Sequence, residues 1–302
     1  MSITSATPGA SRARLVYALF LALPVLLFAV FYLLPVAETI LTSFQKWNGL
    51  SAHRTWVGLR NYTALFGQER FLHSLINNIK WLIFYLLAPP SLGLALALLL
   101  NREIRGETIF KVIFFLPYAI PPVAVASMWR WLYEPSHGLI TVVMQSLGLG
   151  ALAQNWLGNP AIVTYAIMGA ALWWTAGFSF IVFSAGLRNL PSECIEAARL
   201  DGGNAWQIFW RVTFPLLWPS TIIVLGLSAV DAMRIFDIVW AMTNGGPAYA
   251  SDVLATQMYD VAFGRLNMGQ ASAIAVTLLV MAAVFILPYI TYMARHVERT
   301  EA

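Results

Sequence analysis

Three charged residues stand close together in an otherwise apolar stretch of this sequence: Asp231, Arg234 and Asp237. At three-residue spacing, they would lie on adjoining parts of one helix face. Charged groups at membrane depth are costly unless they pair or meet water, so they usually face a bundle interior or a cavity. The cluster therefore predicts one of two things. Either an Arg–Asp pair holds this helix against a neighbour, or the charges form the polar wall of a solute pathway.

Aromatic residues near the cluster suggest which solute such a wall would suit. Trp240 follows Asp237 by about one turn and could stack on a sugar ring, while Arg234 could serve an anionic ligand. Trp173 and Trp174 could line the same path, although packing against a neighbouring helix is the more usual role of a tryptophan pair in a membrane span. The candidate pathway residues are Asp231, Arg234, Asp237, Trp240 and Trp174.

The composition identifies the environment in which these residues must work. The 302 residues are 59% hydrophobic and 11% charged, whereas soluble domains average about 45–50% apolar and about 25% charged residues. The net charge of +4 is small and the basic residues are dispersed, so no nucleic acid partner is expected. The single cysteine, Cys194, excludes an internal disulfide. The chain is predicted to be an integral membrane protein.

Six apolar segments are long enough to cross a hydrocarbon core of about 30 Å, and they predict an all-α, polytopic fold in one domain. The first segment exceeds the apolar region of about 7–15 residues in a cleaved signal peptide, so it is expected to remain as a span. Prolines predict a kink in the second span and bends in the third. We expect loops at 37–75, 134–160 (with a short amphipathic helix) and 248–270, and a charged turn at 101–108. The predicted spans are 15–36, 76–100, 109–129, 161–187, 220–242 and 271–294.

The polar stretch 190–219 between the fourth and fifth spans predicts a helix–turn–helix hairpin. Pro191 suits the first helical position, and Gly202 can adopt the left-handed conformation that ends a helix. A second helix is expected over 204–212, with Asn204 as its N-cap and its end before Pro215. A plain connecting loop would need fewer residues and no such sequence signals.

The distribution of Lys and Arg predicts the orientation in the membrane. Basic residues are denser on the side that carries the two tails (1–14 and 295–302), the turn at 101–108 and the hairpin. Because cytoplasmic segments carry the excess of basic residues, both termini and the hairpin are expected in the cytoplasm.

Sequence signals of catalysis are missing. The sequence has no G-x-x-x-x-G-K-[ST] and no H-E-x-x-H, and its four histidines are scattered. The chain therefore cannot bind nucleotide through a P-loop, and no cofactor, metal site or enzyme active site is expected on it.

The hairpin carries a recognisable motif. Glu196-Ala197-Ala198, three residues, Gly202, nine residues and then Val212-Thr213-Phe214-Pro215 resemble the EAA motif, E-A-A-x3-G-x9-I-x-L-P. This motif marks permease subunits of binding-protein-dependent ABC importers. Val212 and Phe214 replace the usual Ile and Leu and conserve size and apolarity.

Further stretches resemble the carbohydrate-uptake branch of that family over nearly the whole chain. They are G-L-x-N-Y at 58–62, W-x-x-x-G-F at 174–178, and the run from Arg234 to Thr243-Asn244-Gly245-Gly246-Pro247, which is similar to maltose and glycerol-phosphate permeases. The tail lacks the glycine-rich extension expected of the other permease in such pairs.

The resemblance implies partners as well as a fold. It implies a second permease subunit, an ATPase dimer that binds ATP and Mg, an extracytoplasmic solute-binding protein and a bacterial inner membrane. The implied ATPase-docking residues are Glu196, Ala197, Ala198, Asp201 and Gly202. The alternatives are a self-contained secondary transporter or channel, a membrane enzyme, and an ABC permease for amino acids or peptides.

Overall fold

The protein is described by a computed structural model that covers residues 8–100 and 107–301. Helices dominate these residues, so the predicted all-α fold is confirmed; a single pair of short antiparallel strands joins Gln45 to Trp56 and Lys46 to Thr55. The elements are α1 (Pro8–Phe28), η1 (Ala29–Leu33), α2 (Leu34–Ser43), β1 (Gln45–Lys46), β2 (Thr55–Trp56), α3 (Arg60–Phe66), α4 (Glu69–Leu100), α5 (Glu107–Phe115), η2 (Leu116–Ala119), α6 (Pro122–Leu132), α7 (Leu139–Ser146), η3 (Gly150–Leu152), α8 (Val163–Arg188), α9 (Ser192–Leu200), α10 (Ala205–Ile208), η4 (Phe209–Thr213), α11 (Phe214–Leu216), α12 (Trp218–Met233), α13 (Asp237–Thr243), α14 (Leu254–Tyr259), η5 (Asp260–Gly264) and α15 (Met268–Glu301).

Four of the described helices are long and apolar enough to cross a membrane: Leu19–Ser43, Glu69–Leu100, Val163–Arg188 and Met268–Tyr289. Two further segments qualify only as bent pairs. Ile109–Ala119 meets Pro122–Leu132 at 100°, and Ala205–Leu216 meets Trp218–Met233 at 69°. By length and composition there are four spans, or up to six if each bent pair is one span.

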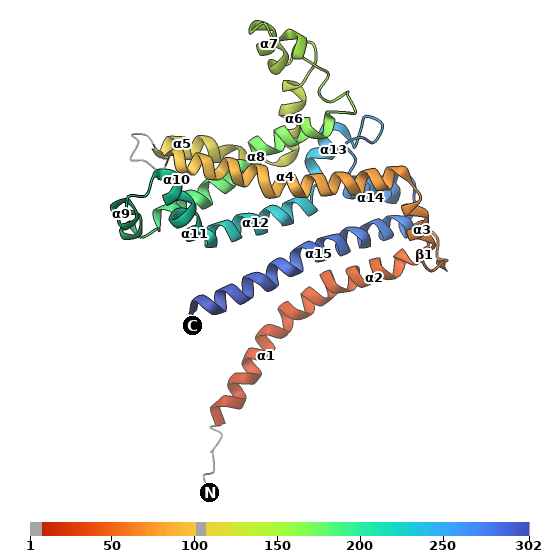
Figure 1. The fold of residues 1–302 in the computed structure, drawn as a ribbon. Coiled ribbons are helices and arrows are strands. Elements are labelled where there is room, and N and C mark those ends of the chain that lie inside the picture. The colour runs from red at the N-terminus through yellow and green to blue at the C-terminus, as the bar shows by residue number, and fades with distance from the viewer. Residues whose placement is uncertain (1–7, 101–106, 302) are drawn as a thin grey trace.

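The centre of the bundle is the pairing of α4 with α8, and α12 lies against both (Figure 1). Gly93 of α4 faces Ser179 of α8 so closely that an added Cβ would clash with the Ser179 side chain. Gly177 approaches the Phe114 carbonyl of α5 in the same way. Small residues such as Gly93 and Gly177 allow membrane helices to approach this closely.

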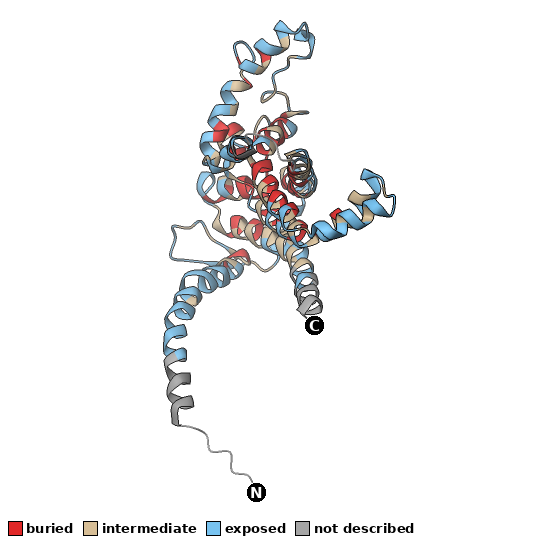
Figure 2. Cartoon of the chain, turned by 90° about the vertical axis from the view of Figure 1, so that its left-hand side faces the viewer, coloured by how far each residue is buried: buried red, intermediate tan, exposed pale blue. Residues whose placement is uncertain are grey.

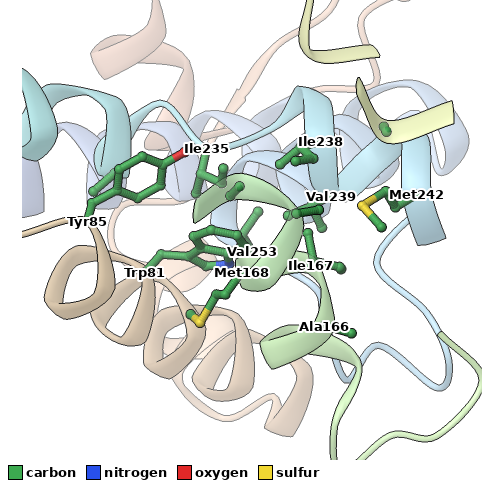
Figure 3. Close-up of a cluster of buried hydrophobic side chains, with 14 of the residues drawn as sticks. Trp81, Tyr85, Ala166, Ile167, Met168, Ile235, Ile238, Val239, Met242 and Val253 are labelled. Atoms are coloured by element: carbon green, nitrogen blue, oxygen red, sulfur yellow. The ribbon is translucent and has the colours of Figure 1, made fainter. Parts of the chain in front are cut away.

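The largest buried cluster lies between α4, α8 and the α12–α13 region. Figure 3 shows Trp81 and Tyr85 of α4 facing Ile167 of α8 and Ile235, and Trp81 is fully buried. Figure 2 shows the buried residues gathered in the middle of the bundle, whereas α1 and α7 are exposed on their outer faces.

The predicted third span is interrupted by a sharp bend. Pro121 has an extended backbone (ψ 139°) and Pro122 begins α6, so the helical hydrogen bonds of α5 and η2 cannot continue through this point. The predicted bend is confirmed; it is a break of 100° between two helices, and a single span over this region stays a prediction.

The loops also differ from the predicted ones. Helix α2 continues to Ser43, because Thr39 and Ser43 donate their hydroxyls to the carbonyls of Pro35 and Ile40 within the helix. Helix α4 begins at Glu69, so the connection expected over 37–75 is shorter and contains β1, β2 and α3. The expected short helix in 134–160 is α7. Most of the charged turn predicted at 101–108 falls on 101–106, outside the described residues.

Candidate solute pathway and docking hairpin

The three charged residues of the predicted fifth span lie at a break between two helices. Helix α12 ends at Met233, Arg234 and Phe236 have non-helical backbones, and α13 begins at Asp237. The expected continuous helix over 220–242 was therefore wrong. No proline or glycine marks the break in the sequence. Asp237 does fit a helix start, because a carboxylate in the first turn interacts favourably with the helix dipole.

The break nevertheless brings the three side chains to one place. Asp231, Arg234 and Asp237 line a cavity of 180 Å³ together with Tyr85 of α4 and Trp174 of α8. Pro122, at the bend of the third predicted span, lines the same cavity. The cavity thus lies where both interrupted segments meet the central α4–α8 pair. Carboxylates, a guanidinium and three aromatic side chains, Phe236 being the third, form a lining that can bind a polar solute.

The charges in this cavity are not joined to one another. No ion pair within 4.0 Å links Arg234 to Asp231 or Asp237 in the part of the chain that the structure describes. Arg234 and Asp237 are exposed and Asp231 is half-buried. Arg234 and Asp231 thus attract each other across the cavity without a direct ion pair, and the choice between a structural cluster and a pathway wall stays a prediction.

Trp174 has a structural contact in addition to its place at the cavity. Its indole Nε1 donates a hydrogen bond of 3.1 Å to the carbonyl of Ile120, immediately before Pro121. Its ring stacks on Tyr118 with 6.2 Å between centroids. The helix break frees the Ile120 carbonyl, and a buried carbonyl without a partner is costly. Trp174 therefore stabilises the bend as well as lining the cavity.

Trp240 lies beside the cavity but does not line it. Its ring stacks on Phe236, with 5.6 Å between centroids and 15° between the planes, and meets the ring of Tyr259 at 4.6 Å. Tyr259 belongs to α14, in the segment expected to be a loop. One face of Trp240 is therefore already covered by Phe236.

The predicted hairpin forms at one end of the bundle (Figure 1). Pro191 precedes α9 as its N-cap, and α9 ends with Gly202 in the left-handed conformation at φ +80°. Asn204 caps α10 through a capping box with Gln207: the Asn204 side chain accepts the backbone N–H of Gln207, and the Gln207 side chain accepts that of Asn204. The turn and cap expected from the sequence are confirmed.

The second helix of the hairpin does not stop before Pro215. It passes through the π turn η4 and continues as α11 to Leu216. Pro215 lies in the last turn of the continuous helix Ala205–Leu216, directly after the wide π turn, and does not end it. The predicted end of the helix was wrong for this reason.

The hairpin presents its motif residues outward. Glu196, Ala197, Asp201 and Gly202 are exposed and Ala198 is half-buried. Leu200 is 89% exposed and Trp206 is 71% exposed on the same hairpin. Large apolar side chains left uncovered beside exposed charges are typical of a protein–protein contact surface.

The sequence analysis missed a polar network at the opposite end of the bundle. The Nε of Arg70 in α4 lies 2.6 Å from a carboxylate oxygen of Asp252. The same guanidinium also pairs with Asp260, and it lies over the ring of Tyr249, 3.8 Å from the ring centroid. The Asp252 side chain is only 1% exposed. Burial raises the pKa of the Asp252 carboxyl above its usual range, and hydrogen bonds from Thr256 and Arg70 oppose that shift.

Two asparagines of α4 complete this network. Asn77 donates to the carbonyls of Ala250 and Asp252, and Asn78 accepts the backbone N–H of Leu254. The region expected to be a loop at 248–270 is therefore a buried segment containing α14 and η5, attached to α4 by side chains. The adjacent asparagines Asn77 and Asn78 in an apolar predicted span were the sequence signal from which this polar network could have been predicted.

The fold and the cavity together define a class: a multi-pass helical membrane protein with a polar site at interrupted helices. More specifically, the chain belongs to the family of binding-protein-dependent transport system inner membrane components, whose model matches residues 90–299. It is thus a membrane permease of an ABC transport system rather than an enzyme, and the family resemblance noted in the sequence is confirmed.

Individual relatives extend the similarity over most of the chain. A probable ABC transporter permease protein of Pyrococcus horikoshii is 35% identical, covering 93% of this chain and 96% of the relative. The trehalose/maltose transport system permease protein MalF of Thermococcus litoralis is 33% identical, covering 86% of this chain and 88% of the relative.

A solved structure has the same fold. It is the crystal structure of a bacterial ABC transporter involved in the import of the acidic polysaccharide alginate, one chain of which superposes with a TM-score of 0.80. The match covers 95% of this chain and 96% of that chain at 23% identity.

Proposed function

We propose that this chain is one permease subunit of an ATP-driven sugar importer and that it forms the solute pathway together with a second permease. The observation that carries this proposal is the cavity at the break between α12 and α13, where Asp231, Arg234 and Asp237 converge without pairing. Unpaired charges at membrane depth usually face water or a solute.

The size of the cavity supports a shared pathway. Its 180 Å³ is below the range of about 300–1,000 Å³ that is typical of small-molecule sites. A second permease facing this chain would supply the remaining wall. The proposed roles are hydrogen bonding to hydroxyl groups for Asp231 and Asp237, attraction of an anionic group for Arg234, and ring stacking for Trp174 and for the uncovered parts of Trp240.

The names of the relatives support a carbohydrate as the solute. They include permeases for trehalose/maltose and diacetylchitobiose, and one for sn-glycerol-3-phosphate. A relative named for uptake of osmoprotective compounds keeps a non-sugar solute as the second candidate. The carboxylates and the guanidinium in the cavity lining fit a polyhydroxylated solute, with or without an anionic group.

We further propose that the hairpin α9–α11 docks on a separate ATPase that binds ATP and Mg. The exposed Glu196, Ala197, Asp201 and Gly202 would make the contact, and Ala198 would allow close approach. Closure of the ATPase pair would displace the hairpin, and α12, which follows it directly, would carry the movement to the break at 234–236. An equilibrium between inward-open and outward-open states would shift because the two states make different contacts with the ATPase.

The proposed orientation follows from this docking. The hairpin and both termini would be cytoplasmic in a bacterial inner membrane, and a solute-binding protein would deliver the sugar on the opposite side. A solved relative of the fold was crystallised with an alginate pentasaccharide-bound periplasmic protein, which supports such a partner.

A deletion strain tests the solute class. Cells without this chain should lose uptake of at least one labelled carbohydrate from a panel, and the unmutated chain should restore it. Loss confined to labelled amino acids or peptides would contradict the sugar assignment while leaving the permease assignment intact.

A further inference from the structure

A basic pocket lies at the end of the bundle opposite the hairpin, between the β1–β2 strands, α3 and the start of α15 (Figure 1). It has a volume of 450 Å³, larger than that of the pathway cavity. Lys46, Arg60 and Arg265 line it, and its lining contains no acidic residue. The pocket does not share any residue with the pathway cavity or the hairpin.

The positive charge of this pocket is only partly compensated. Arg265 lies 3.3 Å from Asp260, a carboxylate that also pairs with Arg70. Lys46 and Arg60 form no ion pair within the described part of the chain. Two cations with no counter-charge face the same space, which favours an anion there.

The start of α15 adds to this preference. Asn267 and Gln270 line the pocket at the N-terminus of this 34-residue helix. The N-terminus of a long helix has a partial positive charge and favours negatively charged groups. The helix contributes only this dipole, because the backbone N–H of Gly269 already bonds the Trp47 carbonyl and that of Gln270 bonds the Asn267 side chain. The Asn61 amide is likewise bonded to the Ser43 and Gln45 carbonyls, so Lys46 and Arg60 are the groups left to contact an anion.

The position of the pocket relative to the membrane indicates the source of the anion. It lies where α2 ends at Ser43 and α15 begins at Met268, which are the outer ends of the two least buried candidate spans. Trp47 also lines the pocket, beside the ends of these two spans. Tryptophan and basic residues at the ends of lipid-exposed spans mark the headgroup region of the bilayer.

We propose that this pocket binds the phosphate of an anionic phospholipid headgroup, with Lys46 and Arg60 as its principal charge partners. Lys and Arg residues at the membrane surface attract anionic headgroups electrostatically. With the hairpin in the cytoplasm, as proposed above, the headgroup would belong to the extracytoplasmic leaflet. The site does not depend on the identity of the transported solute.

Native mass spectrometry of the intact importer complex tests the proposal, with phosphatidylglycerol titrated into the detergent solution. The wild type should retain bound phosphatidylglycerol, and the Lys46→Gln/Arg60→Gln double variant should bind it about 30-fold more weakly, about fivefold for each lost cation. The control is Arg130→Gln. Arg130 is also exposed, but it lies at the end of α6 and does not line the pocket, so this variant should match the wild type.

Other outcomes would overturn the proposal. Equal retention of phosphatidylglycerol by the wild type and the double variant would exclude the pocket as its site. Inorganic phosphate binding that depends on Lys46 and Arg60, without lipid binding, would assign the pocket to a free anion. Unchanged lipid binding with weakened binding of the solute-binding protein would assign it to a carboxylate of that protein. Because Lys46 and Arg60 are exposed, each single variant should fold and lose about fivefold in affinity.

Discussion

Arg70 and Asp252 are 182 residues apart in the sequence, and the Arg70 Nε lies 2.6 Å from the Asp252 carboxylate in the fold. This pair attaches the segment between α13 and α15 to the start of α4. The segment also carries Tyr259, which packs on Trp240 beside the pathway cavity. The aromatic side chains beside the cavity are therefore held in place by a segment that an ion pair at the end of the bundle attaches to α4.

Replacing Arg70 should destabilise the protein strongly. Arg70→Ala would leave Asp252 buried without its cation, at a cost of about 3–5 kcal/mol. Arg265→Ala is the matched control, because Arg265 is half-exposed and pairs with Asp260 at the surface, where such pairs contribute about 0–1 kcal/mol. Thermal unfolding of the purified variants in detergent measures both. Equal melting temperatures for the two variants would contradict the structural importance of the Arg70–Asp252 pair.

Removing the indole N–H of Trp174 should weaken the bend before α6. Trp174→Phe keeps an aromatic ring but leaves the Ile120 carbonyl without its donor, at an expected cost of about 1–3 kcal/mol. Trp173→Phe is the control, since Trp173 contacts Trp129 through its ring. If both variants unfold at the same denaturant concentration, the hydrogen bond does not stabilise the bend.

Arg234 should affect transport more than stability. Arg234→Ala removes an exposed cation from the pathway cavity, so the chain should still fold and insert while the uptake rate or the range of transported solutes changes. Uptake assays with neutral and anionic sugars, normalised to the amount of chain in the membrane, measure this. Uptake of both solute types at wild-type rates would favour a packing role for the cluster.

Gly202→Asp and Glu196→Lys should abolish uptake while leaving membrane insertion intact. Both residues lie on the exposed face of the hairpin, and the space around Gly202 is open, so the main local cost of Gly202→Asp is its left-handed backbone. Gly148→Asp is a matched control for that strain. Gly148 also has a positive φ (+73°) and open space, but lies between α7 and η3. Equal loss of uptake in Gly148→Asp and Gly202→Asp would assign the effect of the glycine substitution to backbone strain, and wild-type uptake by Glu196→Lys, which adds no such strain, would contradict docking.

Features that depend on neighbouring residues were predictable from the sequence. Gly202 and Asn204 mark the ends of the hairpin helices as predicted, whereas Pro191 is the N-cap of α9 rather than its first helical residue. The turn after α13 likewise has left-handed residues at Asn244 and Gly245. In these cases the residues that predict the cap or turn lie within a few positions of it in the sequence.

Features that depend on distant contacts were not predictable. The break at 234–236 has no proline or glycine to mark it, and Arg70 and Asp252 carry no mutual signal in one sequence. The three pathway charges were identified correctly as a group that shares one space, but for the wrong reason. They converge because the helix is interrupted, not because they share a continuous helix face.

Co-purification from detergent-solubilised membranes tests the coupling role of the hairpin most directly. With an affinity tag on this chain, a P-loop ATPase identified by mass spectrometry should accompany the wild type and the Gly148→Asp control. The same ATPase should be absent or strongly reduced with Gly202→Asp and Glu196→Lys, although both variants are present in the membrane. Purification of the wild-type chain without an ATPase, or equal ATPase recovery with all four chains, would contradict the account.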